Sequence, residues 1–118
     1  MVLRGARGRS AVEVNGVYLP TEEKANGKMV FAKRGNDALY IYFAKAKTWN
    51  VSSRSGKEAN DGTGWAHTEA DLAHPLMAKA WTIYDGTNFA AQASFTASLM
   101  VDLQTLLLDN IIYISAYP

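Results

Sequence analysis

Short segments in which apolar and polar residues alternate recur along most of this 118-residue chain, and turn-forming residues separate them. Asn26-Gly27 and Asp85-Gly86 mark two of these turns, because each pair tolerates the positive φ angles of a tight bend. Short strands that follow one another about every 8–12 residues are typical of small antiparallel barrels and sandwiches. The sequence therefore predicts a mainly β domain over residues 11–94, a small antiparallel barrel or sandwich, with a C-terminal helix.

Three consecutive segments predict a β-meander at the centre of this domain. They cover residues 28–33, 38–44 and 48–52, and their side chains alternate with the period of two that a strand requires. Residues 80–93, with Asp85-Gly86 near their middle, predict a separate hairpin. We expect the tryptophans of the chain to be core residues: Trp49, Trp65 and Trp81.

The remaining parts of the domain are less regular. Val12 and Val14 alternate with polar neighbours and predict a short strand. Residues 53–63, "SRSGKEANDGT", are the longest polar stretch, and they predict an exposed loop. "GWAHT", at residues 64–68, then predicts another short strand.

The two ends of the chain differ from this β pattern. Residues 1–10 combine three arginines with glycine and little to bury, so they predict a flexible basic arm. Residues 95–118 are strongly apolar, with Phe95, Leu99 and Leu103 at helical spacing. They predict a helix, or alternatively a hairpin, that packs on the β domain or on a partner. Because one small β domain would cover only part of this apolar surface, we expect a homodimer through residues 95–118.

Composition and charge exclude several classes of protein. The length suits one domain, and the absence of cysteine excludes a disulfide framework, a zinc–thiolate site and a cysteine nucleophile. From residue 11 to residue 94, nine basic side chains balance nine acidic ones, so we expect no nucleic-acid binding. Asp102 and Asp109 make the apolar C-terminal stretch a poor membrane span. No secretory signal pattern is present, so we expect a cytoplasmic protein with no membrane contact.

The stretch "GWAHTEADLAHP" at residues 64–75 most resembles a chemical site, because two histidines and two carboxylates fall within eight positions. They are His67, Glu69, Asp71 and His74. Zincins place two histidines four residues apart on a helix, and zinc deaminases add two cysteines, so neither motif is matched. A site of two histidines and one carboxylate remains the alternative. We expect solvated loop residues near a buried Trp65, with no catalytic residues, no metal and no cofactor.

Tyr40 and Tyr42 share the second face of the strongest predicted strand. That face has several possible environments: ordinary packing, a cover formed by the C-terminal segment, a protein interface, or a ligand groove with Trp49 or Trp81. Tyrosine suits the last two because it buries its ring while its hydroxyl stays in water.

Turn glycines and large aromatic residues over residues 12–93 follow a recognisable order: a Gly-x-Tyr start, an Asn-Gly turn, aromatic strands, and a Pro…Trp…Asp-Gly end. These positions are Gly16, Tyr18, Asn26, Gly27, Phe31, Tyr40, Trp49, Pro75, Trp81, Asp85 and Gly86. In this pattern the chain resembles a small β-rich module of uncharacterised protist proteins, including those of kinetoplastids. The resemblance implies a β fold and carries over no catalytic residue.

Two functions follow from these observations. The neutral domain, the surplus of tyrosine and tryptophan and the apolar C-terminal segment predict a non-catalytic interaction or structural module inside the cell, whose protein partner the sequence does not identify. The alternative is the binding of a small ligand, such as a carbohydrate, through an aromatic groove. A concave aromatic pocket would favour the alternative, because a protein interface can be flat.

Overall fold

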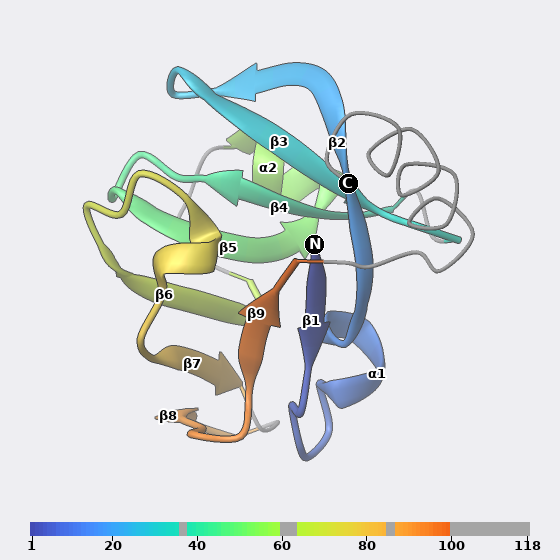
Figure 1. Cartoon of the computed structure of the whole chain (residues 1–118), viewed down its shortest axis with the longest axis vertical. Coiled ribbons are helices and arrows are strands. Elements are labelled where there is room, and N and C mark those ends of the chain that lie inside the picture. The colour runs from blue at the N-terminus through green and yellow to red at the C-terminus, as the bar shows by residue number, and fades with distance from the viewer. Residues whose placement is uncertain (36–37, 60–63, 85–86, 100–118) are drawn as a thin grey trace, which may run out of the picture.

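The structure is a computed structural model that describes residues 1–35, 38–59, 64–84 and 87–99. In these residues the chain forms a nine-stranded antiparallel sheet that curls into a half-barrel (Figure 1). The strands are β1 (Val2–Arg4), β2 (Gly16–Ala25), β3 (Lys28–Lys33), β4 (Leu39–Phe43), β5 (Thr48–Ser53), β6 (Ala66–Ala70), β7 (Trp81–Tyr84), β8 (Phe89–Ala91) and β9 (Thr96–Ser98). Three short helices accompany them: α1 (Ala11–Val14), α2 (Arg54–Ala59) and the 3-10 helix η1 (Pro75–Met77).

The spatial order of the strands is β8-β7-β6-β5-β4-β3-β2-β1-β9. From β1 to β8 each strand therefore pairs with the next one in sequence, as the predicted meander and the predicted hairpin require. The expectation of a mainly antiparallel β fold is confirmed. Its geometry is an incompletely closed barrel, because β8 and β9 are the two edges of the sheet.

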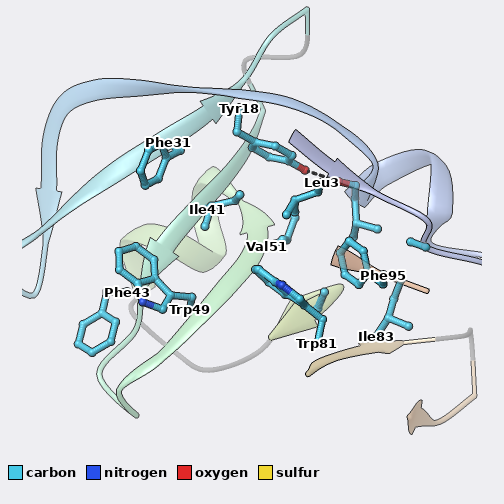
Figure 2. Packing of buried hydrophobic residues seen from close by; sticks show 13 residues of the cluster. Leu3, Tyr18, Phe31, Ile41, Phe43, Trp49, Val51, Trp81, Ile83 and Phe95 are labelled. Atoms are coloured by element: carbon cyan, nitrogen blue, oxygen red, sulfur yellow. Dashed lines mark hydrogen bonds between the residues drawn. The ribbon is translucent and has the colours of Figure 1, made fainter. Parts of the chain in front are cut away.

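The core lies on the concave side of the sheet, where alternate residues of most strands converge (Figure 2). Trp49 and Trp81 are almost fully buried there, as expected from the sequence. Trp81 packs against Phe95 with ring centroids 5.2 Å apart. The Tyr18 hydroxyl donates a 2.9 Å hydrogen bond to the Val14 carbonyl, which satisfies a polar group inside this apolar cluster.

A second apolar cluster lies on the convex side, beneath α2. It contains Val30, Tyr40, Tyr42 and Ala44. Of the environments predicted for the tyrosine face, the structure shows packing within the domain, with α2 as the cover. Trp49 and Trp81 lie in the concave cluster, so these tyrosines form no groove with them.

The N-terminal residues are part of the sheet. Because residues 2–4 form β1, the prediction of a flexible arm over residues 1–10 is wrong for these residues. β1 pairs with β2 on one side and with β9 on the other, where Leu3 lies opposite Gly16 and Ala97. Leu3 is fully buried. Pairing on both sides supplies stability that ten residues rich in glycine and arginine do not have by themselves.

Two further expectations between the strands are corrected. The predicted strand at Val12 and Val14 is the helical turn α1, which buries Val14 and leaves Val12 exposed. The predicted loop over residues 53–63 contains α2, and Lys57 of this helix is buried. In both places a short helix brings a side chain to the sheet, a contact that local composition does not reveal.

The predicted C-terminal helix is not seen in the part of the tail that the structure describes. Phe95 is buried and residues 96–98 form β9, so the β domain extends beyond the expected boundary at Ser94. Pairing with β1 explains this strand, since Thr96 lies opposite Arg4 and Ser98 opposite Val2. Residues 100–118, with the rest of the predicted helix or hairpin, lie outside the described residues.

Candidate ligand-binding groove

The two histidines of the stretch at residues 64–75 have separate environments. His67 lies on β6 opposite Asn50 and Thr82, and its ring lies 5.4 Å from that of Phe89. His74 precedes η1, and its Nδ1 atom accepts a 3.1 Å hydrogen bond from the Leu76 N–H. The His74 ring also meets the edges of core aromatic side chains, with its centroid 5.5 Å from that of Phe31.

The two acidic residues of the same stretch have contacts with neighbouring backbone, Glu69 through its carboxylate and Asp71 through its own backbone. Glu69 accepts hydrogen bonds of 3.2 and 3.3 Å from the Lys79 N–H. Asp71 has a φ angle of 66°, and its N–H donates to the Lys47 carbonyl. Within the described residues, no group of three or more metal-ligating side chains comes together. The four candidates are therefore distributed along a strand and the connection that follows it.

Burial lowers the pKa of both histidines below the usual value. For His74 the nearby N-terminal ammonium lowers the pKa further. The neutral imidazole is consequently the favoured form of each side chain in the folded protein at neutral pH.

A groove of about 490 Å³ opens on the convex side of the sheet, beside α2. Four neighbouring elements form its wall: the end of β5, the helix α2, the residues just before β6, and the end of β7. The lining residues are Ser52, Ser53, Ser55, Gly56, Ala59, Gly64, Trp65 and Tyr84.

Trp65 and Tyr84 give the groove its aromatic surface. The two residues are neighbours across the sheet, because the Tyr84 N–H donates a 2.8 Å hydrogen bond to the Trp65 carbonyl. Both side chains are half-buried. This corrects the expectation that Trp65 is a core residue: it contacts the core cluster but also lines an open groove.

Serine hydroxyls and glycine backbone give the groove its polar surface. Ser53 Oγ lies 3.1 Å from Ser55 Oγ and accepts a 3.2 Å hydrogen bond from the Gly56 N–H. A Cβ atom at Gly64 would lie 2.4 Å from the Val51 carbonyl oxygen, so only glycine fits between this strand and the groove. None of the lining residues placed by the structure is charged.

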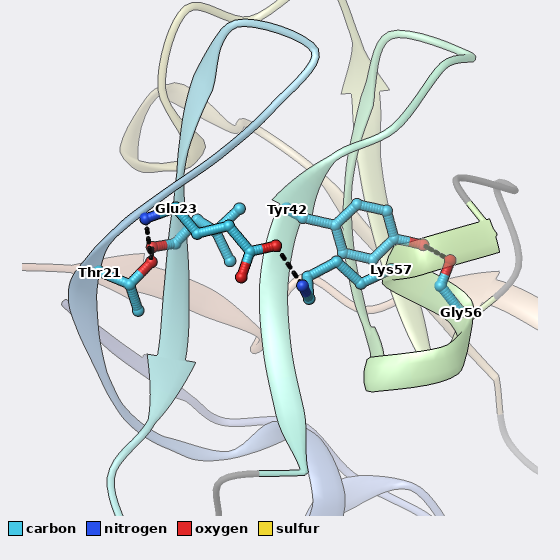
Figure 3. A network of polar contacts seen from close by, with 6 residues as sticks. Thr21, Glu23, Tyr42, Gly56 and Lys57 are labelled. Carbon is cyan, nitrogen blue, oxygen red and sulfur yellow. Dashed lines mark hydrogen bonds and ion pairs between the residues drawn. The ribbon is translucent and has the colours of Figure 1, made fainter.

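The helix that forms one side of the groove is fixed by a polar network on its other side (Figure 3). Lys57 forms an ion pair with Glu23, and its ammonium lies 4.9 Å from the centre of the Tyr40 ring. Tyr42 donates a 3.3 Å hydrogen bond to the Gly56 carbonyl. These contacts hold α2 against β4.

Sequence reasoning identified Trp65 but assigned it to the core, and it did not identify Tyr84 or the serines as site residues. One signal was present: the polar residues 53–63 are rich in small hydroxyl and glycine residues, and Trp65 follows them after a single further glycine, Gly64. The convergence of this segment with Tyr84 depends on the pairing of β6 with β7, which is a tertiary contact.

Comparisons with known proteins assign no family to the chain: no family model, no curated protein and no solved structure matches it. Among the described residues, no helix has both the length and the apolar character needed to cross a membrane.

Proposed function

We propose that this protein is a non-catalytic binding domain whose groove beside α2 holds a small, uncharged, hydroxyl-rich ligand of the carbohydrate class. The observation that carries the proposal is the combination of Trp65 and Tyr84 with three serines in one groove whose described lining residues are uncharged. This is the alternative that the sequence raised, and the aromatic rings and hydroxyl groups that line this open groove support it.

The size and chemistry of the groove support this ligand class. Its volume of about 490 Å³ lies within the range of about 300–1,000 Å³ that is usual for small-molecule sites. Aromatic faces pack against apolar C–H surface, while serine hydroxyls both donate and accept hydrogen bonds. A sugar ring offers both kinds of surface, whereas a charged ligand would leave its charge unpaired in this lining.

The lining also supports binding without catalysis. A serine becomes a nucleophile when a neighbouring base takes its proton. Ser53 Oγ has hydrogen-bond contacts with the Ser55 hydroxyl and the Gly56 N–H, and neither is a base. His67 lies against Phe89 and His74 lies beside η1, and neither is among the lining residues of the groove that the structure places.

A glycan array probed with the full chain tests the proposal. We expect retention of one group of neutral glycans, with Trp65→Phe weakening it and Ser55→Ala weakening it less. Met77→Ala is the matched control, because Met77 is 57% exposed on η1 and lies outside the groove. Binding that is unaffected by the Trp65 and Ser55 variants would overturn the proposal, as would retention of no glycan.

A parallel experiment with peptides addresses the first function predicted from the sequence, a protein-interaction module. Aromatic grooves also bind proline-rich peptides. A proline-rich peptide array is probed in the same way. If it retains the chain and Trp65→Phe weakens that retention, while the glycan array retains nothing, the ligand is a protein segment and the carbohydrate proposal is wrong. The predicted homodimer through residues 95–118 stays a separate prediction, because none of the groove residues that the structure places belongs to that segment.

A further inference from the structure

The aromatic surface does not end at the groove but continues across the convex face to the edge of the sheet. Tyr84, in the groove wall, lies opposite Phe89 of β8, with ring centroids 5.2 Å apart. Phe89 in turn lies 5.4 Å from the His67 ring. We name the row formed by Trp65, Tyr84, Phe89 and His67 the aromatic row.

Strand alternation places this row on the outer face. Trp81 and Ile83 of β7 are buried in the concave core, so Thr82 and Tyr84 between and beyond them point outward. His67 lies opposite Thr82, and Phe89 lies opposite Tyr84, so both share this face. Neighbouring strands are about 4.8 Å apart, and the row crosses three of them, which gives it a length of about 10 Å.

Phe89 has the two properties expected of a stacking residue in a binding site: its ring is exposed, and neighbouring rings hold it in place. Its side chain is 48% exposed, although two other rings contact it. These contacts fix the ring before any ligand arrives, so binding loses little side-chain entropy. β8 is also the edge strand of the described sheet, so no further strand covers the outer end of the row.

We infer that the groove and the aromatic row form one extended site that binds at least two consecutive rings of an uncharged polysaccharide, one against Trp65 and Tyr84 and the next on Phe89. This inference rests on the proposed function and adds to it the minimum length of the bound polysaccharide. It also assigns a role in binding to Phe89 and His67, which do not line the groove itself.

The described side chains of the groove and the aromatic row are uncharged, which favours a neutral chain over a nucleic acid, whose bases also stack on aromatic rings. A phosphate backbone requires lysine or arginine along the stacking surface. The exposed Arg7 and Arg9 belong to the N-terminal segment that bonds Gln92 and Tyr84, beside the row rather than within it. The cations of α2 face away from the row: Arg54 and Lys57 lie 5.3 and 4.9 Å from the Tyr40 ring. Burial lowers the pKa of His67, which leaves its imidazole neutral at pH 7.

A chain-length series of β-1,4-linked glucose, from the monosaccharide to the hexasaccharide, together with the same series of the best glycan on the array, tests this inference by calorimetry. We expect the affinity to rise from one ring to two or three rings. Phe89→Ala should abolish this rise, with a loss of about tenfold in affinity for the longer chains, and should leave the single ring unaffected. Phe89→Leu, which keeps apolar area but has no ring face, should also lose most of the rise.

Met29→Ala provides the matched control, because Met29 is 45% exposed on β3 and lies far along the strand order from β8. Affinity that depends on Trp65 but not on chain length or on Phe89 would overturn the extended site and leave the groove intact. Binding of no glycan in either series would overturn the proposed function and this inference with it. Folding of each variant is checked by its tryptophan emission and thermal transition.

Discussion

The side chain of Gln92 exchanges two hydrogen bonds with the backbone of Arg7, in the manner of a paired strand residue. The Arg7 N–H donates to Gln92 Oε1 over 2.8 Å, and Gln92 Nε2 donates to the Arg7 carbonyl over 3.0 Å. These residues are 85 positions apart in sequence. The bonds join the N-terminal segment to the chain just after β8, across the open side of the half-barrel.

Gln92→Ala should therefore lower the free energy of unfolding by about 1–2 kcal/mol, since each hydrogen bond contributes about 0.5–1.5 kcal/mol net. Gln92→Glu keeps the acceptor and loses the donor, so we expect an intermediate loss. Urea unfolding measures the free energy of unfolding of the two Gln92 variants. Glu22→Ala, at an exposed site on β2, is the control. Equal stability of all three variants would mean that this contact does not help to close the fold.

Two glycines of the N-terminal segment allow a matched test of its packing. Gly5 and Gly8 have φ angles of 85° and 89°, so an alanine is similarly strained at either position, by about 1–2 kcal/mol. A Cβ atom at Gly5 would lie 1.8 Å from the Ser94 carbonyl oxygen, whereas one at Gly8 would meet nothing within 4 Å. We expect Gly5→Ala to be the more destabilising by about 1–3 kcal/mol in chemical denaturation. Similar losses would contradict the close approach of these two segments.

The lowered pKa values of His67 and His74 predict how stability depends on pH. In the unfolded chain a histidine titrates near pH 6.5, and in the folded protein each of these titrates below that value. The unfolded state thus binds more protons in this window, so the stability that the neutral forms provide is present above pH 6.5 and is lost as the pH falls through the folded pKa.

Urea midpoints measured between pH 5 and pH 7.5 should therefore fall toward the acid end. His74→Asn offers a side-chain acceptor for the Leu76 N–H and cannot titrate, so it should reduce the slope. His67→Gln should reduce it independently. A slope that is unchanged in the double variant would show that other groups cause the pH dependence.

The ion pair beneath α2 predicts an unequal response to the removal of its two partners. The Lys57 side chain is 4% exposed, whereas Glu23 is 48% exposed. Glu23→Ala leaves a buried ammonium without its carboxylate and should cost about 1–2 kcal/mol, less than a fully buried pair because water reaches Glu23. Lys57→Met keeps an unbranched apolar side chain against Tyr40 and should cost less than about 1 kcal/mol. A double-mutant cycle by urea unfolding tests this order, and the reverse order would contradict it.

The parts of the fold that sequence predicted are those that depend on local periodicity. Residues 39–43 are a continuous run of aliphatic and aromatic residues, and they form β4 with both faces buried. The hairpin around Asp85-Gly86 pairs as expected, with Thr82 opposite Ala91. In β7 the alternate residues Trp81 and Ile83 are buried, and a strand with one buried face tolerates only one register.

The parts that sequence missed depend on contacts between distant residues. Leu3 is buried because it lies between Gly16 and Ala97, and no local pattern around it indicates this. α2 has only six residues, fewer than an isolated helix requires, and it is held by packing on β4 and β5. The groove arises in the same way, since Ser55 and Tyr84 converge only after β5, β6 and β7 have paired.

The last prediction concerns self-association through the C-terminal residues. Because Phe95 is buried and β9 pairs with β1, a truncation that leaves the β domain intact begins after Leu99. Leu99 is 73% exposed, and residues 100–118 add many large aliphatic side chains. Burial of each such side chain contributes about 1.5–3 kcal/mol, which favours association if they are not all covered within one subunit.

We expect light scattering to show a dimer for the full chain and a folded monomer for residues 1–99. A full chain that is monomeric at high concentration, or a truncated chain that is still dimeric, would contradict this contact.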